Sequence, residues 1–300
     1  MLVTLSEDTE VFLNQDWFNL VSKPNSSLFI ELSYKGSKLI AGFEQKQYGF
    51  LSYLKCPKFT PYNISINHID DNSNEYSVYA KEVHLLNELK QQLKKYNRFQ
   101  IKCLPTLNIV SPFLDKHTKA YYYTTCFINQ SIPIEQCWNN MESATRNHIL
   151  YGEKNLKIEL NGTLEQVKSF IVVNSYYQRE GLSYALLELV FDTLKPRELI
   201  KLFISKKENE IVSIAFFIKS RDVWYYWLNI NNQEIKSRGS NAVLIWEGIK
   251  LAKLQNCHFN FDGSIVPHLE QVFKSFGSRN LAYCNIVSNQ HLLFRLISKF

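Results

Sequence analysis

The stretch that decides the fold reads Phe259-Asn-Phe-Asp-Gly-Ser-Ile-Val-Pro-His-Leu-Glu-Gln-Val-Phe-Lys-Ser-Phe-Gly-Ser-Arg279. It predicts an apolar strand, Cys257–Phe261, which ends at Asp262-Gly-Ser264, residue types that favour turns and helix caps. A short amphipathic helix follows, with apolar residues at helical spacing: Leu269, Val272, Phe273 and Phe276. Gly277 occupies the place of a left-handed helix C-cap. The pattern thus puts an acid and a hydroxyl at the carboxyl end of a strand, where α/β proteins bind ligands. Asp262 either faces such a ligand or caps the helix that follows.

The composition predicts a globular protein with more than one core. The chain has 300 residues, 45% hydrophobic and 21% charged, which exceeds the size of an ordinary single domain. Its net charge of +6 permits a phosphate-bearing ligand but does not by itself indicate nucleic acid. The 6 cysteines form no Cys-x-x-Cys pair, so we expect reduced, buried thiols and no metal site. We see no signal peptide and no apolar run that could span a membrane, and therefore expect a cytoplasmic protein.

The first part of the chain predicts a compact α/β unit. Lys35-Gly-Ser37 is a hairpin signal between two strands, and leucines at helical spacing from Leu86 to Leu93 predict an amphipathic helix. The expected elements are a helix at 10–22, strands at 28–34, 38–43 and 48–54, a polar segment at 63–75, a helix at 86–96 and a strand at 99–104. Prolines at 105 and 112 interrupt the pattern. We therefore place a boundary nearby and expect two domains, residues 1–118 and 119–300.

The second part predicts strands that alternate with helices. Thr163 and Gln166 have the spacing of a capping box. The expected elements are a strand at 120–128, a helix from 134 to about 148, a strand at 156–160, helices at 163–177 and 184–195, strands at 199–205, 211–219 and 223–230, a helix from 242 and strands at 257–261 and 282–287. We expect the strands at 223–230 and 257–261 to be adjacent and parallel and to diverge at their carboxyl ends.

Several motifs resemble the FemAB-like branch of the GNAT acyltransferase superfamily. The run from Asn260 to Pro267, followed by Phe273-Lys-Ser-Phe-Gly277, is similar to the C-terminal signature of that branch. Further pieces occur in the same order: Lys58-Phe-Thr-Pro-Tyr62, Ala144-Thr-Arg-Asn147, Tyr177-Gln-Arg-Glu-Gly181 and Gly239-Ser-Asn-Ala-Val-Leu-Ile-Trp-Glu247. The resemblance covers about residues 15 to 288. It implies an α/β fold of two tandem GNAT-like domains, each a mixed, mostly antiparallel sheet flanked by helices, the first domain being a smaller, degraded copy.

A candidate phosphate site lies at Lys236-Ser-Arg-Gly-Ser-Asn241. Backbone N–H groups at a helix N-terminus carry partial positive charge, and a glycine lets a phosphate approach them. The segment is similar to the GNAT pyrophosphate loop and departs from it at the first and last places, Lys236 and Asn241. We therefore expect the cofactor-binding residues to be Lys236, Arg238, Gly239, Ser240 and Asn241. An ordinary loop with a helix cap at Ser240 is the alternative.

The resemblance also implies the acceptor side of a site. Asp262 and Glu180 are the candidate catalytic residues, because a carboxylate can take a proton from an attacking amine. The candidate substrate-binding residues are Tyr62, Arg146, Tyr177 and Ser264. Each has a plainer alternative, such as packing for Tyr62 or a helix-dipole contact for Arg146. No Gly-x-Ser-x-Gly motif or Cys/His pair indicates a covalent nucleophile.

The expected function is N-acyl or N-acetyl transfer from acyl-CoA or acetyl-CoA to an amine, on a small molecule or on a cell-envelope or polysaccharide precursor. A FemAB-type aminoacyltransferase that uses aminoacyl-tRNA is an alternative, and a non-catalytic GNAT scaffold that binds a ligand or partner is another. The mild charge and the lack of a heptad insertion favour the thioester donor. The acceptor and the oligomeric state stay open.

Overall fold

The structure is a computed structural model that describes residues 10–68, 74–107, 109–173, 183–235, 237–262 and 267–297. The chain divides into two compact units. The first unit comprises Val11–Thr124 and the segment that begins at Leu281, and the second comprises Thr125–Asn280 with Glu10. The sequence placed a single boundary after residue 118, whereas the last segment groups with the amino-terminal half. That residues 1–118 and 119–300 are two separate domains stays a prediction.

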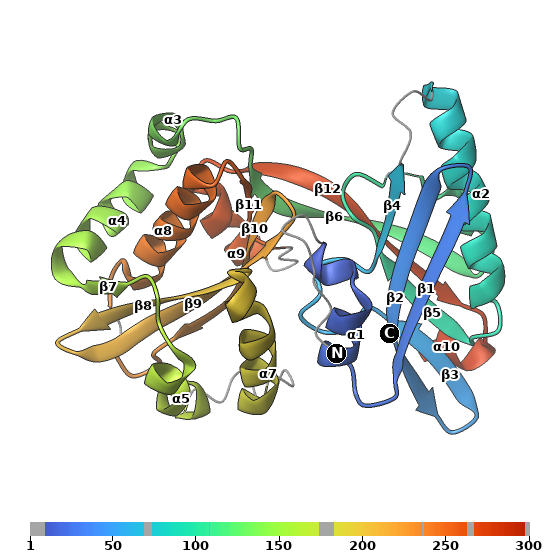
Figure 1. Ribbon diagram of the computed structural model, residues 1–300, viewed down its shortest axis with the longest axis horizontal. Helices are drawn as coiled ribbons and strands as arrows, with labels where there is room; N and C mark the ends of the chain where they lie inside the picture. The colour runs from blue at the N-terminus through green and yellow to red at the C-terminus, as the bar shows by residue number, and fades with distance from the viewer. Residues whose placement is uncertain are drawn as a thin grey trace. The chain divides into compact units, whose positions relative to one another are not determined.

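The first unit is a sheet with helices on its faces (Figure 1). Its strands are β1 (Ser27–Tyr34), β2 (Ser37–Tyr48), β3 (Leu51–Lys55), β4 (Ile64–His68), β5 (Arg98–Lys102) and the larger parts of β6 (Thr118–Ile128) and β12 (Arg279–Asn289). Its helices are η1 (Val11–Leu13), α1 (Gln15–Val21), α2 (Glu75–Leu93), η2 (Ser111–Phe113) and α10 (Leu292–Ile297). The strand order is β1-β2-β3-β5-β12, with β4 paired to β2. The predicted hairpin at Lys35-Gly-Ser37 is confirmed, because β1 and β2 pair from Tyr34↔Ser37 onward.

Strand β4 lies in a segment that the sequence predicted to be polar and without a strand. It pairs with β2 from Ser37↔His68 to Ala41↔Ile64. The buried side chain of Asn63 bridges the neighbouring backbones, donating to Gly42 O (2.8 Å) and accepting from Lys102 N–H (2.7 Å). The polar side chain thus replaces part of a hydrogen-bond ladder, which hydrophobic patterning cannot reveal.

The second unit is a mostly antiparallel sheet between two layers of helices (Figure 1). Its strands are the end of β6 (Thr118–Ile128), β7 (Lys157–Glu159), β8 (Ile200–Lys207), β9 (Glu210–Ser220), β10 (Val223–Asn231) and β11 (His258–Asn260). Its helices are α3 (Ile134–Asn139), α4 (Ser143–Asn155), α5 (Leu164–Val173), α7 (Tyr184–Leu194), η3 (Lys195–Arg197), α8 (Ser240–Leu254) and α9 (Pro267–Lys274). The strand order is β6-β11-β10-β9-β8-β7.

Adjacent phenylalanines of β9 show how the two helical layers are built. Phe217 packs under α8, where a Cβ on Gly248 would lie 2.3 Å from its ring. Phe216 packs on the other face, its ring 6.4 Å from that of Phe191 in α7. Both phenylalanines are fully buried, and each such burial contributes about 1.5–3 kcal/mol. Alternation along one strand therefore fixes α4 and α8 on one face and α5 and α7 on the other (Figure 1).

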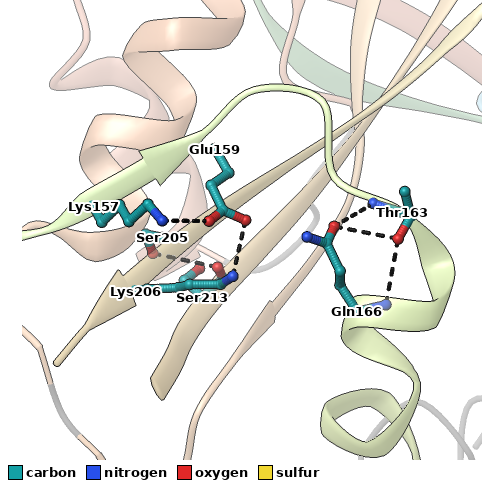
Figure 2. Close-up of polar contacts among 7 residues, drawn as sticks. All are labelled: Lys157, Glu159, Thr163, Gln166, Ser205, Lys206 and Ser213. Atoms are coloured by element: carbon teal, nitrogen blue, oxygen red, sulfur yellow. Dashed lines mark hydrogen bonds and ion pairs between the residues drawn. The ribbon is translucent and has the colours of Figure 1, made fainter. Parts of the chain in front are cut away.

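The capping box predicted before α5 is present (Figure 2). Thr163 N–H donates to Gln166 Oε1 (2.8 Å), and Gln166 N–H donates to Thr163 Oγ1 (3.4 Å). On the neighbouring strands, Glu159 accepts from Lys206 (2.9 Å), and this bond, more than any other contact, lowers the pKa of the Glu159 carboxyl (Figure 2). These contacts hold the start of α5 and the edge strand β7.

The helix predicted from residue 134 to about 148 is two helices, α3 and α4, separated at Asn140–Glu142. Gly277, at a φ of +75°, approaches the break so closely that a Cβ on it would lie 2.9 Å from the carbonyl oxygen of Asn140. Arg146 therefore lies inside α4 and not at the end of a helix. The apolar spacing across the two helices is continuous, so periodicity alone missed the break.

Candidate functional site

The candidate site lies in the second unit, where the pairing between β10 and β11 ends. The two strands are parallel neighbours, as predicted, and their register runs from Val223↔His258 to Tyr225↔Asn260. Beyond that pair β10 continues to Asn231, whereas β11 ends at Asn260. The pairing of β10 with β9 shifts between Tyr226 and Leu228, so Trp227 is the extra residue of a β-bulge. Such bulges redirect a strand and are frequent next to active sites.

A cavity of about 350 Å³ lies at the carboxyl end of β10 and the N-terminus of α8. Its polar lining consists of His148, Asn231, Asn232, Ser237, Ser240 and Asn241, and its apolar lining of Val212, Ile235, Ala242, Ile245, Val272 and Phe276, together with Gly239. No Asp, Glu, Lys or Arg occurs among these described lining residues. The cavity thus combines apolar walls with uncharged polar groups, which can orient a small ligand.

The N-terminus of α8 opens on this cavity without a side-chain cap. Gly239 is the N-cap residue, with a φ of +79°, and it makes no side-chain cap hydrogen bond. Val243 N–H donates to Gly239 O (2.9 Å), so the amides of Asn241 and Ala242 precede the first internal bond of the helix. Uncapped first-turn amides attract anions, because their partial positive charges add to the helix dipole.

The helix predicted from Ala242 begins two residues earlier, at Ser240. Ser240 is the first helical residue and not the cap, and its hydroxyl donates to Ser237 O (3.0 Å). Gly239 is packed against α4, where a Cβ on it would lie 2.1 Å from the carbonyl oxygen of His148. The missing side chain therefore admits a neighbouring helix, and the approach of a phosphate to this glycine stays a prediction.

Arg238, the described basic residue of the predicted phosphate loop, is not among the residues that line the cavity. Arg238 is exposed, and its guanidinium lies 5.4 Å from the ring centre of Tyr151 in α4. Lys236 falls outside the described residues. Asn241 accepts a hydrogen bond from the hydroxyl of Tyr226 (2.6 Å), which ties the first turn of α8 to the bulged part of β10. Asn232 accepts from Glu234 N–H and Ile235 N–H (2.9 Å each) and so shapes the loop between them.

Asp262 lies two residues after the end of β11, which is Asn260. Its φ is +61°, a left-handed conformation that Asp and Asn tolerate better than most residues. Its N–H donates to Asn260 Oδ1 (2.9 Å), and the same oxygen accepts from the hydroxyl of Thr125 (2.6 Å). Helix α9 begins at Pro267, so Asp262 is not the residue adjacent to its first turn. A catalytic role for Asp262 stays a prediction.

The structure describes two of the remaining predicted site residues, Arg146 and Tyr62. Arg146 reaches back to α3, where its guanidinium donates to the carbonyls of Trp138 and Asn139 (3.4 Å each) and to that of Met141. Tyr62 belongs to the first unit, is 3% exposed and lies with its ring 6.0 Å from that of Phe12. These contacts account for both positions without a substrate. Glu180, Tyr177 and Ser264 lie outside the described residues.

The cysteines of the second unit are poor nucleophiles. All six cysteines of the chain are free, and five of them are buried, as predicted. Burial raises the pKa of the thiols of Cys126, Cys137 and Cys257, which disfavours the reactive thiolate. These thiols therefore do not suggest a covalent acyl intermediate. Within the described part of the chain no group of three or more His, Cys, Asp and Glu has the geometry to hold a metal ion.

His258 lies at the start of β11, at the opposite end from the parting of the strands. Its Nδ1 accepts from Gln130 N–H (3.0 Å), and its Nε2 lies 3.4 Å from a carboxylate oxygen of Asp222. Burial lowers the pKa of this imidazole, and the neighbouring Asp222 opposes that effect. These contacts give His258 a structural role.

Comparison with known proteins agrees with this geometry. Residues 159–262, from β7 to the end of β11, match the family described as the acetyltransferase (GNAT) domain. The crystal structure of FemX is similar to this chain with a TM-score of 0.62 and 14% identity, over 90% of each chain. No curated protein matches the sequence significantly.

Two further solved structures have the same fold. The C-terminal domain of a putative lysylphosphatidylglycerol synthetase from Agrobacterium fabrum is similar with a TM-score of 0.56 and 10% identity, over 97% of this chain and 90% of that one. A GNAT-family acetyltransferase from Colwellia psychrerythraea is similar with a TM-score of 0.50 and 12% identity, over 92% and 94%. The chain therefore has the fold of the FemAB-like branch of the GNAT superfamily, and residues 159–262 match the GNAT acetyltransferase domain.

The match of residues 159–262 to the acetyltransferase (GNAT) domain supports acyl transfer as the general class of activity. None of the described helices combines the length and the apolar character that crossing a bilayer requires.

Proposed function

We propose that the protein transfers an acyl group from an acyl-coenzyme A to an amine, at the cavity between the end of β10 and the start of α8. The observation that carries this proposal is a cavity at the carboxyl end of β10 that also meets the uncapped N-terminus of α8. Earlier in β10, the pairing with the parallel strand β11 ends at Tyr225↔Asn260 and a β-bulge follows at Trp227. Each feature supplies one requirement of the reaction.

The start of α8 supplies the anion site. The diphosphate of coenzyme A would bind the first-turn amides, where the helix dipole is most favourable. No acidic side chain occurs among the described cavity residues, so nothing in this lining repels a phosphate. The described part of the candidate loop offers Arg238 as a cation, but its guanidinium stacks on Tyr151. Lys236 stays a proposed second contact.

The parted strands supply room for the thioester. Backbone N–H groups of β10 beyond its pairing with β11 would polarise the acyl carbonyl, which is the electrostatic help that acyl transfer needs most. A carboxylate then takes the proton from the amine. Asp262 at the end of β11 is our first candidate and Glu180 the second; Tyr177 and Ser264 stay proposed acceptor contacts.

The acceptor is proposed to be an amine on a small molecule or on an envelope or polysaccharide precursor, in the cytoplasm. The second candidate function is transfer of an aminoacyl group from tRNA, which the fold similarity to FemX favours. A GNAT scaffold without turnover is the third possibility. Donor binding separates these proposals, because only the first requires an acyl-coenzyme A.

The test is isothermal titration of acetyl-coenzyme A into the wild-type protein and two variants of Ser237, which lines the cavity before α8. Ser237→Asp places a negative charge beside the proposed diphosphate, whereas Ser237→Asn is its neutral match. Two unit charges 4 Å apart interact by about 4 kcal/mol at an effective dielectric constant of about 20. We therefore expect at least a tenfold weaker affinity for Ser237→Asp and wild-type affinity for Ser237→Asn.

An acid near the start of a helix does not weaken the helix, so a loss of affinity in Ser237→Asp is not a loss of fold. Equal affinities of the two variants for acetyl-coenzyme A would show that the donor does not bind at the start of α8. The absence of acetyl-coenzyme A binding to the wild type would overturn the proposal and leave the tRNA and scaffold alternatives.

A further inference from the structure

One end of the first unit exposes a group of large apolar side chains. Tyr48 and Phe50 form the tip of the β2–β3 hairpin and are 79% and 77% exposed. The short helix α10 adds three leucines, Leu292, Leu293 and Leu296, that are 58%, 44% and 50% exposed. A cluster of exposed apolar side chains is unusual on a soluble protein and marks an interaction surface. We call these five residues the hairpin patch.

Specific contacts join the hairpin to α10. The ring of Phe50 lies 5.8 Å from that of His291, and the ring of Tyr53 lies 5.7 Å from that of Phe294. Figure 1 shows α10 close to β3 at this end of the unit. The hairpin patch is therefore one continuous surface and not two separate exposures.

The turn between α2 and β5 lies in the same place. Asn97 O accepts from Gln290 N–H (2.9 Å) and His291 N–H (3.1 Å), and Asn97 Oδ1 accepts from Ser52 N–H (2.8 Å). This turn follows Lys94 and Lys95, both exposed at the end of α2. Arg98, next in the chain, has its guanidinium carbon 5.7 Å from the ring centre of Phe294. The hairpin patch is therefore bordered by basic side chains.

The charge of this end is mostly positive, although Asp115 pairs with Lys90 (3.1 Å). The segments 45–55, 90–102 and 285–300 contain no Asp or Glu, and they contain several Lys and Arg residues. The acid that precedes the hairpin, Glu44, is 5% exposed and already paired with Lys46 (3.6 Å) and Lys55 (3.0 Å). The exposed apolar groups thus lie within a positively charged border. A protein partner with an ordinary mixed surface does not require that combination.

We propose that the hairpin patch docks on the surface of an anionic phospholipid bilayer. Tyrosine is favoured at the membrane–water interface, because its ring is apolar and its hydroxyl reaches water. Apolar side chains that enter the headgroup region together with basic residues around them are the two attractions that hold proteins on such surfaces. The positive border selects anionic headgroups over neutral ones. This inference goes beyond acyl transfer and does not depend on it, because binding is measured without turnover.

The test is co-sedimentation of the full chain with vesicles of phosphatidylcholine and with vesicles of phosphatidylcholine mixed with phosphatidylglycerol. The apolar variant is Tyr48→Ala with Phe50→Ala. Its control is Tyr76→Ala, because Tyr76 is also 79% exposed and lies at the other end of α2. The charge variant is Lys95→Gln with Lys35→Gln as control, since each lysine is exposed and lies over the ring of a neighbouring tyrosine (5.4 and 5.3 Å).

We expect the wild type to sediment with the anionic vesicles and not with the neutral ones. The double variant should bind at least tenfold more weakly and Lys95→Gln about fivefold more weakly, as expected for one basic residue at such a surface. Both controls should bind as the wild type does, and added salt should weaken binding.

Equal sedimentation of the wild type with neutral and anionic vesicles would overturn the proposal, as would a loss in Tyr76→Ala as large as that in the double variant. Light scattering tests the other partner that could bind the hairpin patch, a second copy of the chain, because it measures the molar mass in solution. A wild-type dimer that the double variant converts to a monomer, without vesicle binding by the wild type, would assign the hairpin patch to self-association and refute membrane docking.

Discussion

Gly239 gives the sharpest test of how the start of α8 is positioned. Its φ of +79° and its contact with α4 both exclude a side chain, for two separate reasons. An alanine in the left-handed region costs about 1–2 kcal/mol wherever it occurs. At Gly239 the added Cβ would also lie 2.1 Å from His148 O, which belongs to the backbone of α4 and cannot rotate away. Overpacking of this kind adds about 1–3 kcal/mol, so Gly239→Ala should cost about 2–5 kcal/mol.

The matched control is Gly49→Ala. Gly49 also has a positive φ, +57°, but a Cβ there would meet no atom within 4 Å. It should therefore show the backbone cost alone, about 1–2 kcal/mol. The difference between the two variants isolates the contact between α8 and α4. Because a Cβ on Gly152 would in turn lie 3.0 Å from Gly239 O, Gly152→Ala should also be destabilising.

The assay is chemical unfolding followed by circular dichroism and by tryptophan fluorescence. Of the 5 tryptophans, Trp17 alone lies in the first unit, so the fluorescence change reports mainly the second unit, where Gly239 lies. Gly49 lies in the first unit, so its variant is followed by circular dichroism. Equal costs for Gly239→Ala and Gly49→Ala would refute the account, because they would show that α4 does not approach Gly239 as described.

Two further predictions concern β11 and its end. Burial lowers the pKa of His258 from its ordinary value of 6.5, so its neutral form contributes stability above about pH 6.5 that is lost as the pH falls through the folded-state pKa. The free energy of unfolding, measured from pH 7.5 to 5, should therefore fall more steeply for the wild type than for His258→Gln. Parallel curves for the two proteins would refute this. Asp262→Asn should keep wild-type stability, because Asn tolerates positive φ, while Asp262→Ala should lose about 1–2 kcal/mol of unfolding free energy. Once an acceptor is known, full turnover by Asp262→Asn would exclude the carboxylate as the base.

Much of the second unit follows from local patterns. The parallel neighbours β10 and β11 were predictable because a helix, α8, connects two apolar strands, which is the ordinary route to a parallel pair. The capping box at Thr163 and Gln166 was predictable because both partners lie within one turn. Such features depend on residues close together in the chain.

The misses depend on residues far apart in the chain. Strand β4 is held by Asn63, which bridges backbones 21 and 39 residues away. The break between α3 and α4 is packed against Gly277, and the guanidinium of Arg146 satisfies carbonyls at the end of α3. Gly239 meets α4 and not only the cavity. A glycine or an arginine in a motif therefore has two equally good explanations until its spatial neighbours are known.

The central claim is that the donor binds where β10 and β11 part. Amide hydrogen exchange, measured by mass spectrometry with and without saturating acetyl-coenzyme A, tests it most directly. Bound donor should slow exchange in residues 226–231, the last part of β10, and in residues 237–245, which lead into and form the first turns of α8. Exchange in residues 27–55 of the first unit should stay unchanged. Protection confined to the first unit, or binding without protection in either segment of the second unit, would contradict the claim.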